Sequence, residues 1–341
     1  MNLAKTEYKS IDLFKFIAST LVVALHTKPF ASDADLDYYF TCFCRLAVPF
    51  FFIATSFFFF RKEKPDIKRY SKRLSILYLL WFLIELPIVY NRFFVLHDKP
   101  FAQQVLNFVR SLIFNNTWYA SWFIMACILG VNIVYYLSKK IRDKKLLLIG
   151  IIAYLFSLSC SGYYGIVDSL LSKKMTGFHA IVSFIFMPAN SFFVALIYVV
   201  LGKIVAEQVQ NGNEKSPYIF SKKTHLAIIV MLLFIGAGEA YFIRWSALST
   251  DAILVLPLIT FFLFSWLLQT QLSLPTSICR LLRSMSILVY ILHPIFQLLN
   301  HSLLKIDNGM LLYCLTLTES LMLAYLIVTM SKRVTILKWL Y

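Results

Sequence analysis

The sequence has little charge, little glycine and little proline. Only 15% of its 341 residues are charged, against about 25% in soluble globular domains, which excludes that class. Ten glycines and ten prolines are too few for a collagen-like fibre or a low-complexity disordered chain. The six cysteines show neither a pairing pattern nor a metal-ligand spacing beyond one C-F-C, so we expect no disulfide scaffold and no metal.

Apolar residues are abundant instead. They make up 60% of the chain, with 32 phenylalanines and a mean hydropathy of +0.73. This composition predicts a multi-pass protein in contact with the lipid bilayer, in a cell membrane such as a bacterial plasma membrane. The net charge of +16 would suggest a nucleic-acid partner on a soluble protein. Because the basic residues lie in short loops between apolar segments, we expect no nucleic-acid partner.

Ten segments satisfy the requirement of about 20 mostly apolar residues for a transmembrane helix. The predicted spans are Ile11–Thr27, Cys42–Phe60, Leu74–Val89, Trp118–Leu137, Leu146–Ser161, Ile181–Gly202, Leu226–Ile243, Ala252–Gln269, Ser284–Leu299 and Met310–Met330. The fold class predicted from them is an all-α polytopic membrane bundle of about ten helices. We expect one integral-membrane domain over residues 1–341, without a separate soluble domain or a cleavable signal.

The distribution of Lys and Arg predicts the orientation of the bundle. The loops on the side of both termini hold 23 of the 33 basic residues, the opposite loops hold 8, and Lys15 and Arg45 lie inside spans. Cytoplasmic loops carry the excess of positive charge in membrane proteins. The sequence therefore predicts that both termini are cytoplasmic.

Charged groups inside spans are candidate site residues, because burying a charge at mid-membrane costs about 2.5–3.5 kcal/mol on insertion scales. In the first span, Lys15 and His26 are eleven residues apart, which puts them on one helix face about 16 Å apart along the axis. That spacing suits a cation holding an anionic group near the inner side and an imidazole available for proton or acyl transfer farther out. Alternatively, Lys15 reaches the inner headgroups and His26 hydrogen-bonds a neighbouring helix.

Two further candidates lie near the outer part of the predicted bundle or within it. Arg45 begins the second span, at a depth close to that of His26, where it either holds a carboxylate or oxyanion or anchors the helix at the interface. His293 lies halfway through the ninth span and precedes Pro294, a pairing common where a bundle encloses a polar cavity. The alternative for His293 is a satisfied packing histidine.

Other polar groups carry weaker signals. Glu85, Glu239 and Glu319 lie inside or at the ends of spans, and we expect structural pairs or interfacial positions for them, with partners that the sequence does not identify. Arg69, Lys72 and Arg73 fall on one face of a helix that leads into the third span. Such a face suits lipid headgroups or the phosphates of a nucleotide cofactor, although topology alone also explains it.

These motifs together resemble the acyltransferase family 3 membrane proteins. Lys15 and His26, with the phrase VVALHT, are similar to that family's signature of a basic residue, ten intervening residues and a histidine. The other similar stretches are Arg45–Ser56, Lys72-Arg73, Trp122-Phe123 and Tyr290–Pro294. The phrases AVPFFF and SWFIMACILG also resemble the membrane domain of vancomycin-resistance serine racemases. The sequence departs from the family pattern at two arginines. Lys15 replaces the first, and Ala189 replaces the second, which precedes the asparagine that is Asn190 here.

The resemblance implies transfer of an acyl group, usually acetyl, from cytoplasmic acyl-coenzyme A to an outer acceptor such as a surface polysaccharide or a lipid-linked sugar. It implies that His26 is the catalytic histidine and that Arg45 and His293 line the tunnel or acceptor site. The residues implied to hold the acyl donor are Lys15, Arg69, Lys72 and Arg73. The supporting residues implied are Asp12, Trp122 and Tyr290.

Two functions remain open on the sequence. One is a transmembrane acyltransferase, and the other is a transporter or exporter of a small polar solute, such as an amino acid, on the same bundle. The outer segments Tyr90–Thr117 and Gly162–Ala180 are the predicted acceptor contacts. The oligomeric state is not predicted.

Overall fold

The computed structural model describes residues 7–95, 100–114, 118, 121–171, 175–210, 220–249 and 252–341, and all regular secondary structure in them is helical. The helices are α1 (Lys9–Thr27), α2 (Ala34–Cys44), α3 (Ala47–Phe60), α4 (Ile67–Ile84), α5 (Leu86–Tyr90), the π-helix η2 (Asn91–Val95), α6 (Phe101–Phe114), α7 (Ser121–Ser138), α8 (Asp143–Ser159), α9 (Tyr164–Leu170), α10 (Met175–Ile185), the 3-10 helix η3 (Pro188–Asn190), α11 (Phe192–Gln210), α12 (Lys222–Ile243), α13 (Leu256–Leu268), α14 (Thr276–Ser302), α15 (Gly309–Met330) and the 3-10 helix η4 (Thr335–Leu340).

The predicted polytopic helix bundle is confirmed, whereas the count of ten spans is not. Within the described ranges, seven helices are long and apolar enough to cross a membrane, or nine if two bent pairs each count as one span. The bent pairs are α4 with Leu86–Val95, at 73°, and α8 with α9, at 86°. The predicted span 252–269 corresponds to α13, which has only 13 residues.

The surface of the bundle is apolar, as expected for a multi-pass membrane protein. On α12, Phe234 and Phe242 are 76% and 70% exposed. A face of this kind is stable against lipid and costly against water, because lipid tails are as apolar as the side chains.

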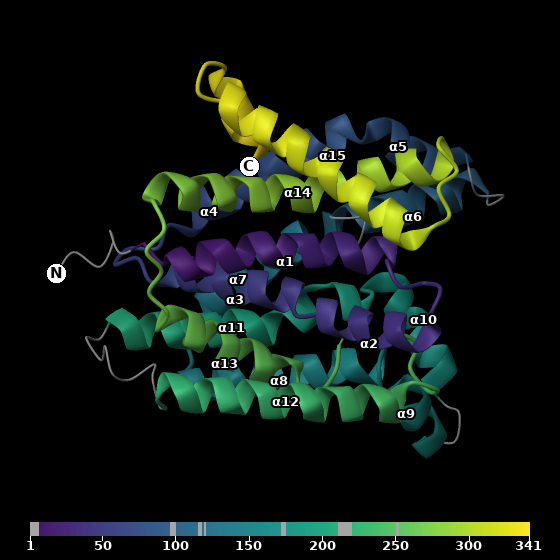
Figure 1. Cartoon of the computed structure of the whole chain (residues 1–341). Coiled ribbons are helices and arrows are strands. Elements are labelled where there is room, and N and C mark those ends of the chain that lie inside the picture. The colour runs from purple at the N-terminus through teal and green to yellow at the C-terminus, as the bar shows by residue number, and fades with distance from the viewer. Residues whose placement is uncertain are drawn as a thin grey trace.

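Helix α1 lies in the middle of the bundle, with α14 on one side and α3 on the other (Figure 1). Helices α1 and α14 run parallel, since Asp12 contacts Arg283 near their starts and His26 stacks on His293 farther along. Contacts of Glu7 with Arg280 and of Arg73 with the Tyr341 carbonyl bring both ends of the described chain to the end of the bundle where α1 and α4 start. That this end is cytoplasmic stays a prediction.

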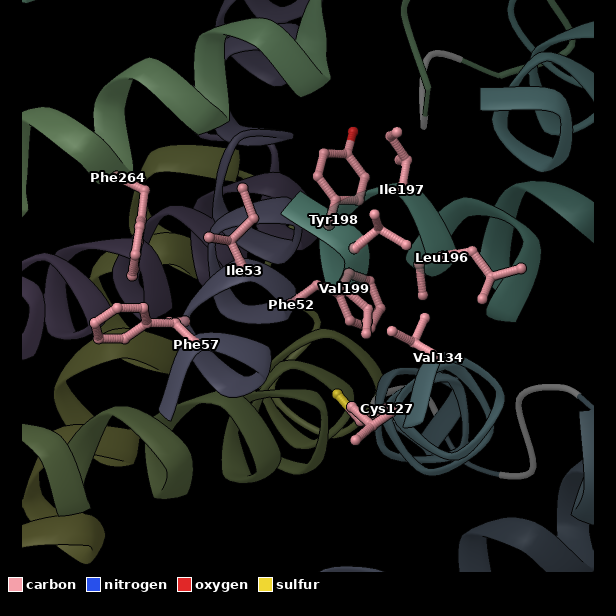
Figure 2. Close-up of a cluster of buried hydrophobic side chains, with 14 of the residues drawn as sticks. Phe52, Ile53, Phe57, Cys127, Val134, Leu196, Ile197, Tyr198, Val199 and Phe264 are labelled. Atoms are coloured by element: carbon pink, nitrogen blue, oxygen red, sulfur yellow. The ribbon is translucent and has the colours of Figure 1, made fainter. Parts of the chain in front are cut away.

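The core next to α1 is built by α3, α7, α8 and α11. Figure 2 shows apolar side chains of α3, α7 and α11 in this core, together with Phe264 of α13. Helix α11 approaches α3 closely at Gly202, where a Cβ atom would lie 2.5 Å from the Ile53 carbonyl oxygen. At the same crossing, the Ser56 hydroxyl donates a hydrogen bond to the Val199 carbonyl at 2.6 Å. Small residues and interhelical hydrogen bonds are the usual means of tight packing in membranes, and this contact fixes α11 beside the site described next.

Candidate active site

A pocket of about 250 Å³ opens among α1, the α2–α3 junction, α7, η3, α11 and α14. Five residues that the sequence analysis singled out line it: His26, Arg45, Trp122, Tyr290 and His293. They come from segments as far apart as the first span and the ninth, so the predicted candidates converge on one place.

Two histidines from different helices lie against each other in the wall of this pocket. The rings of His26 and His293 stack with centroids 5.2 Å apart and planes at 29°. His26 is exposed to the pocket, whereas His293 is 1% exposed. The Gln297 side chain donates a hydrogen bond to the His26 carbonyl at 2.7 Å, so α14 fixes the end of α1 that carries His26. Stacked imidazoles at this distance favour at most one positive charge, because like charges at short range repel.

The position of the His293 proton follows from its hydrogen bond. Its Nδ1 lies 3.3 Å from the Val289 carbonyl oxygen, and a carbonyl can only accept, so Nδ1 carries the hydrogen. Nε2 of the neutral ring then presents a lone pair. Nε2 is buried and has no hydrogen-bond partner among the described residues. An imidazole held in one tautomer whose basic nitrogen has no protein partner is suited to accept a proton or a hydrogen bond from a ligand.

Arg45 supplies the permanent positive charge among the described residues that line the pocket. It lies at the break between α2 and α3, where its backbone N–H caps α2 on the Thr41 and Cys42 carbonyls. The helix restarts at Ala47, and Pro49 lies in its first turn, where a missing N–H is tolerated. The break therefore brings a guanidinium next to His26 without exposing it to lipid.

Aromatic side chains form the deeper wall of the pocket. Phe52 lies between Trp122, with ring centroids 6.1 Å apart, and Tyr198, at 6.4 Å. Tyr198 donates a hydrogen bond to the Tyr154 hydroxyl at 3.3 Å, and Tyr154 donates to the Ile253 carbonyl at 2.6 Å. The hydroxyl proton of Tyr198 is thus donated to Tyr154 rather than to the pocket. The sequence analysis did not single out Tyr198 or Phe52 as site residues, because each is typical of an ordinary core aromatic.

The short helix η3 closes one side of the pocket with Ala189 and Asn190. It follows Met187, whose φ of 42° lies in the left-handed region, a conformation that costs a non-glycine residue about 1 kcal/mol or more. The methyl group of Ala189 lies where the sequence pattern of the resembled family has an arginine. In this chain, the η3 side of the pocket is therefore uncharged.

Asp12 and Lys15 lie outside the pocket, toward the start of α1. Asp12 is fully buried and accepts two hydrogen bonds from Arg283 of α14, at 2.8 and 2.5 Å. The Lys15 ammonium lies 4.5 Å above the Phe58 ring, and the Arg61 guanidinium lies 5.6 Å from the same ring. Arg283 was missed by the sequence analysis, because it is one of many basic residues in a cytoplasmic segment.

The basic face at the start of α4 is helical, as predicted, and Arg69, Lys72 and Arg73 are all exposed. Arg73 donates to the Tyr341 carbonyl at 3.4 Å, and Trp81 donates to the Leu340 carbonyl at 3.1 Å. The segment that contains η4 thus packs along α4 beside the basic face. Exposed cations at the same end of the bundle as Lys15 fit an anionic ligand.

The three glutamates have different surroundings. Glu239 accepts hydrogen bonds from the backbone N–H groups of Leu254 and Val255 and from the Tyr163 hydroxyl, so it caps the approach to α13. Glu319 accepts a hydrogen bond from Asn300 at 2.7 Å. Glu85 is 1% exposed, and neither of its carboxylate oxygens has a hydrogen-bond partner among the described residues.

The predicted acceptor segments do not reach the pocket in the part of the chain that the structure describes. Its lining includes no described residue of 90–117 or 162–180. Residues 96–99, 115–117, 119–120 and 172–174, which include parts of both segments, lie outside the described residues. The prediction that these segments contact an acceptor is therefore untested.

Comparison with known proteins identifies related chains. A family model described as an acyltransferase domain matches residues 8–329. An amino-acid racemase of Enterococcus faecalis is 28% identical over 98% of this chain and 48% of its own length. A second amino-acid racemase of that organism is 31% identical over 65% of the chain and 30% of its own length. A serine/alanine racemase of Enterococcus gallinarum is 26% identical over 84% and 40%.

The chain spans less than half the length of each of these three relatives. No solved structure matches it significantly.

Proposed function

The chain belongs to the acyltransferase family whose domain model covers residues 8–329, and from this premise we propose that it transfers an acyl group across the membrane. The donor in this proposal is cytoplasmic acyl-coenzyme A, with acetyl as the acyl group. The acceptor is a hydroxyl of an extracytoplasmic glycan, such as a surface polysaccharide or a lipid-linked sugar. The family match supports acyl transfer by a membrane protein, and the donor and acceptor are the further content of the proposal.

In the proposed step, the acceptor oxygen attacks the acyl carbonyl carbon, a C–O bond forms and the thioester C–S bond breaks. The hydroxyl proton passes by way of His26 to the departing thiolate, which gives an ester and a free thiol. Arg45 stabilises the negative charge on the tetrahedral oxygen, a contribution typically worth about 10²–10³ in rate. His293, which lines the pocket and whose Nε2 has no hydrogen-bond partner among the described residues, receives a hydrogen bond from the acceptor and orients it.

One observation carries the proposal. The stacked pair of His26 and His293 lies with Arg45 in a single pocket, which unites an imidazole able to accept a proton with an oxyanion-stabilising cation, the two kinds of group that acyl transfer from a thioester requires. Lys15 and the face of Arg69, Lys72 and Arg73 support a donor site at the opposite end of α1, about 16 Å away along the helix.

Coenzyme A binding tests the donor half of the proposal. Isothermal calorimetry would compare the detergent-purified protein with its Lys72→Ala/Arg73→Ala variant, using acetyl-coenzyme A as titrant. We expect binding in the micromolar range, weakened about two- to thirtyfold in the variant, as two exposed charge contacts would allow. A well-folded protein that binds neither acetyl-coenzyme A nor coenzyme A would overturn acyl transfer from this donor.

Transport of a small polar solute is the second candidate. It is supported by the absence of an arginine at Ala189 and by the names of the relatives, which describe enzymes of amino acids. Uptake of labelled serine into proteoliposomes distinguishes the two functions. Uptake that survives Lys72→Ala/Arg73→Ala, without coenzyme A binding, favours the carrier, and no uptake together with acyl transfer favours the enzyme.

A further inference from the structure

The carboxyl group of Glu85 lies at the break between α4 and α5, and Glu85 is not among the residues that line the candidate active site. It separates α4 from α5, whose direction with η2 differs from that of α4 by 73°. Pro87 in the first turn of α5 has no N–H to continue the α4 hydrogen-bond ladder. The neighbours Leu83 and Leu86 are 61% and 44% exposed, whereas Glu85 is 1% exposed. The chain therefore turns the carboxyl inward while its neighbours face outward.

The surroundings of this carboxyl are apolar. Trp81 and Val89, four residues before and after Glu85, are buried in one cluster with Phe93 and Trp118. Both Glu85 oxygens lack a hydrogen-bond partner within the described ranges. An ionised carboxylate in such a site costs many kcal/mol, so the group is neutral there.

The charged groups on the elements packed against the break do not compensate for it. Arg92 of η2 stacks on the ring of the residue that follows it. Arg110 of α6 donates to a carbonyl of α10, and Lys338 of η4 is exposed. None of the three forms an ion pair with Glu85 among the residues described, and α7, which also packs on α4, carries no charged side chain.

A proton is the ligand that fits this site best. Calcium takes six to eight oxygen ligands and magnesium keeps near-octahedral geometry, whereas Glu85 offers two oxygens in an apolar cluster. No group of three or more His, Cys, Asp or Glu side chains suited to a metal occurs among the described residues. A proton needs a single oxygen and leaves the group neutral.

We propose that Glu85 is an exchangeable proton-binding site within the membrane, set at the α4–α5 break. Glu85 is not among the residues that line the pocket, and the existence of this site does not depend on the function proposed above. Intramembrane acids that bind and release protons mark proton-linked functions of membrane proteins. The site lies at the bend between α4 and α5, next to the exposed side chains of Leu83 and Leu86, so the carboxyl is only a short distance from the surface of the bundle.

Labelling with the hydrophobic reagent dicyclohexylcarbodiimide tests the proposal on the full chain reconstituted in phosphatidylcholine vesicles. This reagent adds to protonated carboxyl groups in apolar surroundings, and peptide mass spectrometry locates the adduct. We expect an adduct at Glu85 and its loss in Glu85→Gln. Above the titration midpoint the labelling rate should fall about tenfold for each pH unit, in step with the protonated fraction. The exposed Glu63 is the internal control and should react only with a water-soluble carbodiimide.

Three results would overturn the proposal, and each can be obtained on the unmodified protein. They are the absence of an adduct at Glu85 at acid pH, a labelling rate that is the same across the pH series, and protection by sodium ions, which would assign the site to a metal cation. If Glu85→Gln fails to fold, infrared spectra of the unmodified protein keep the proposal testable. A band of a protonated carboxyl that shifts in D₂O supports exchange, and a band that does not shift contradicts it.

Discussion

Along the parallel helices α1 and α14, two pairs of side chains face each other, one toward each end. Near the starts, Asp12 and Arg283 satisfy each other with two short hydrogen bonds. Farther along, His26 and His293 stack, and the buried Nε2 of His293 has no partner among the described residues. The same two helices thus carry an ion pair whose members satisfy each other and a histidine pair with an unpartnered nitrogen, and the histidine pair lines the pocket described above.

The glutamates repeat this difference. Glu239 is held by three donors, whereas Glu85 has no hydrogen-bond partner within the described part of the chain. Buried polar groups are normally hydrogen-bonded. Some buried polar side chains stabilise the bundle and others are available to a ligand, and the two kinds differ in whether a protein partner is present rather than in residue type. This comparison leads to five predictions.

Removing the imidazole of His26 should have the largest effect on the rate of acyl transfer. We expect His26→Ala to lower acyl transfer by about 10²–10⁴, the usual contribution of a general base, with an unchanged melting temperature. Ester formation from labelled acetyl-coenzyme A in proteoliposomes measures it. His301→Ala, an exposed histidine at the end of α14, should leave the rate unchanged. Equal losses in both variants would contradict the assignment.

Breaking the ion pair of Asp12 and Arg283 should reduce stability instead. Arg283→Met leaves the buried Asp12 carboxylate without this partner. Such a loss costs about 3–5 kcal/mol in fully buried pairs, and less here, because the Arg283 side chain is 43% exposed. We expect a lower melting temperature in detergent, followed by fluorescence. Arg283→Lys should recover part of the loss, since it restores the charge without the planar fork. A melting temperature equal to that of the wild type would show that the pair is dispensable.

The cation in the pocket should affect the rate rather than the fold. Arg45→Met should lower the turnover number by about 10²–10³, as removal of an oxyanion-stabilising group does. The control is Arg244→Met, which removes the Arg244–Asp35 ion pair outside the pocket. A rise in the Michaelis constant with unchanged turnover would assign Arg45 to substrate binding.

The two glutamates should respond differently to the same substitution. Glu239→Gln loses charge-assisted hydrogen bonds and should reduce stability by about 1–3 kcal/mol. Glu85→Gln replaces a neutral carboxyl with a neutral amide of the same shape and should change the stability less. Thermal unfolding of both variants side by side measures the difference, and the reverse order would contradict the division between partnered and unpartnered groups.

The exposed basic face should give the smallest effect. Lys72→Ala/Arg73→Ala should raise the Michaelis constant for acetyl-coenzyme A by about two- to thirtyfold, as expected for two exposed charge contacts. The effect should shrink as salt is added. Lys144→Ala/Lys145→Ala removes two exposed cations at the start of α8 and serves as the matched control. Equal effects in the two variants would indicate general attraction rather than a donor site.

The sequence alone determined the class of the fold. Apolar runs of the length of a bilayer have few alternatives to membrane helices, because every backbone polar group must be satisfied within the segment. The cost of burying polar groups in the membrane also identified His26, Arg45 and His293 as candidates. These three line the pocket together with Trp122 and Tyr290 from the same motifs. The number of spans was less predictable, because hydropathy does not report the bends after Ile84 and Ser159 or the shortness of α13.

Only the tertiary structure decided which partners these groups have. Asp12 and His26 lie in one predicted helix, and the sequence indicated both as site residues. In the structure, Asp12 is hydrogen-bonded by Arg283, 271 residues away in sequence. His26 lines the pocket instead. Glu85 and Glu239 are likewise indistinguishable in the sequence. Whether a buried polar group is satisfied depends on atoms brought to it by distant helices, and spacing along one helix carries no information about them.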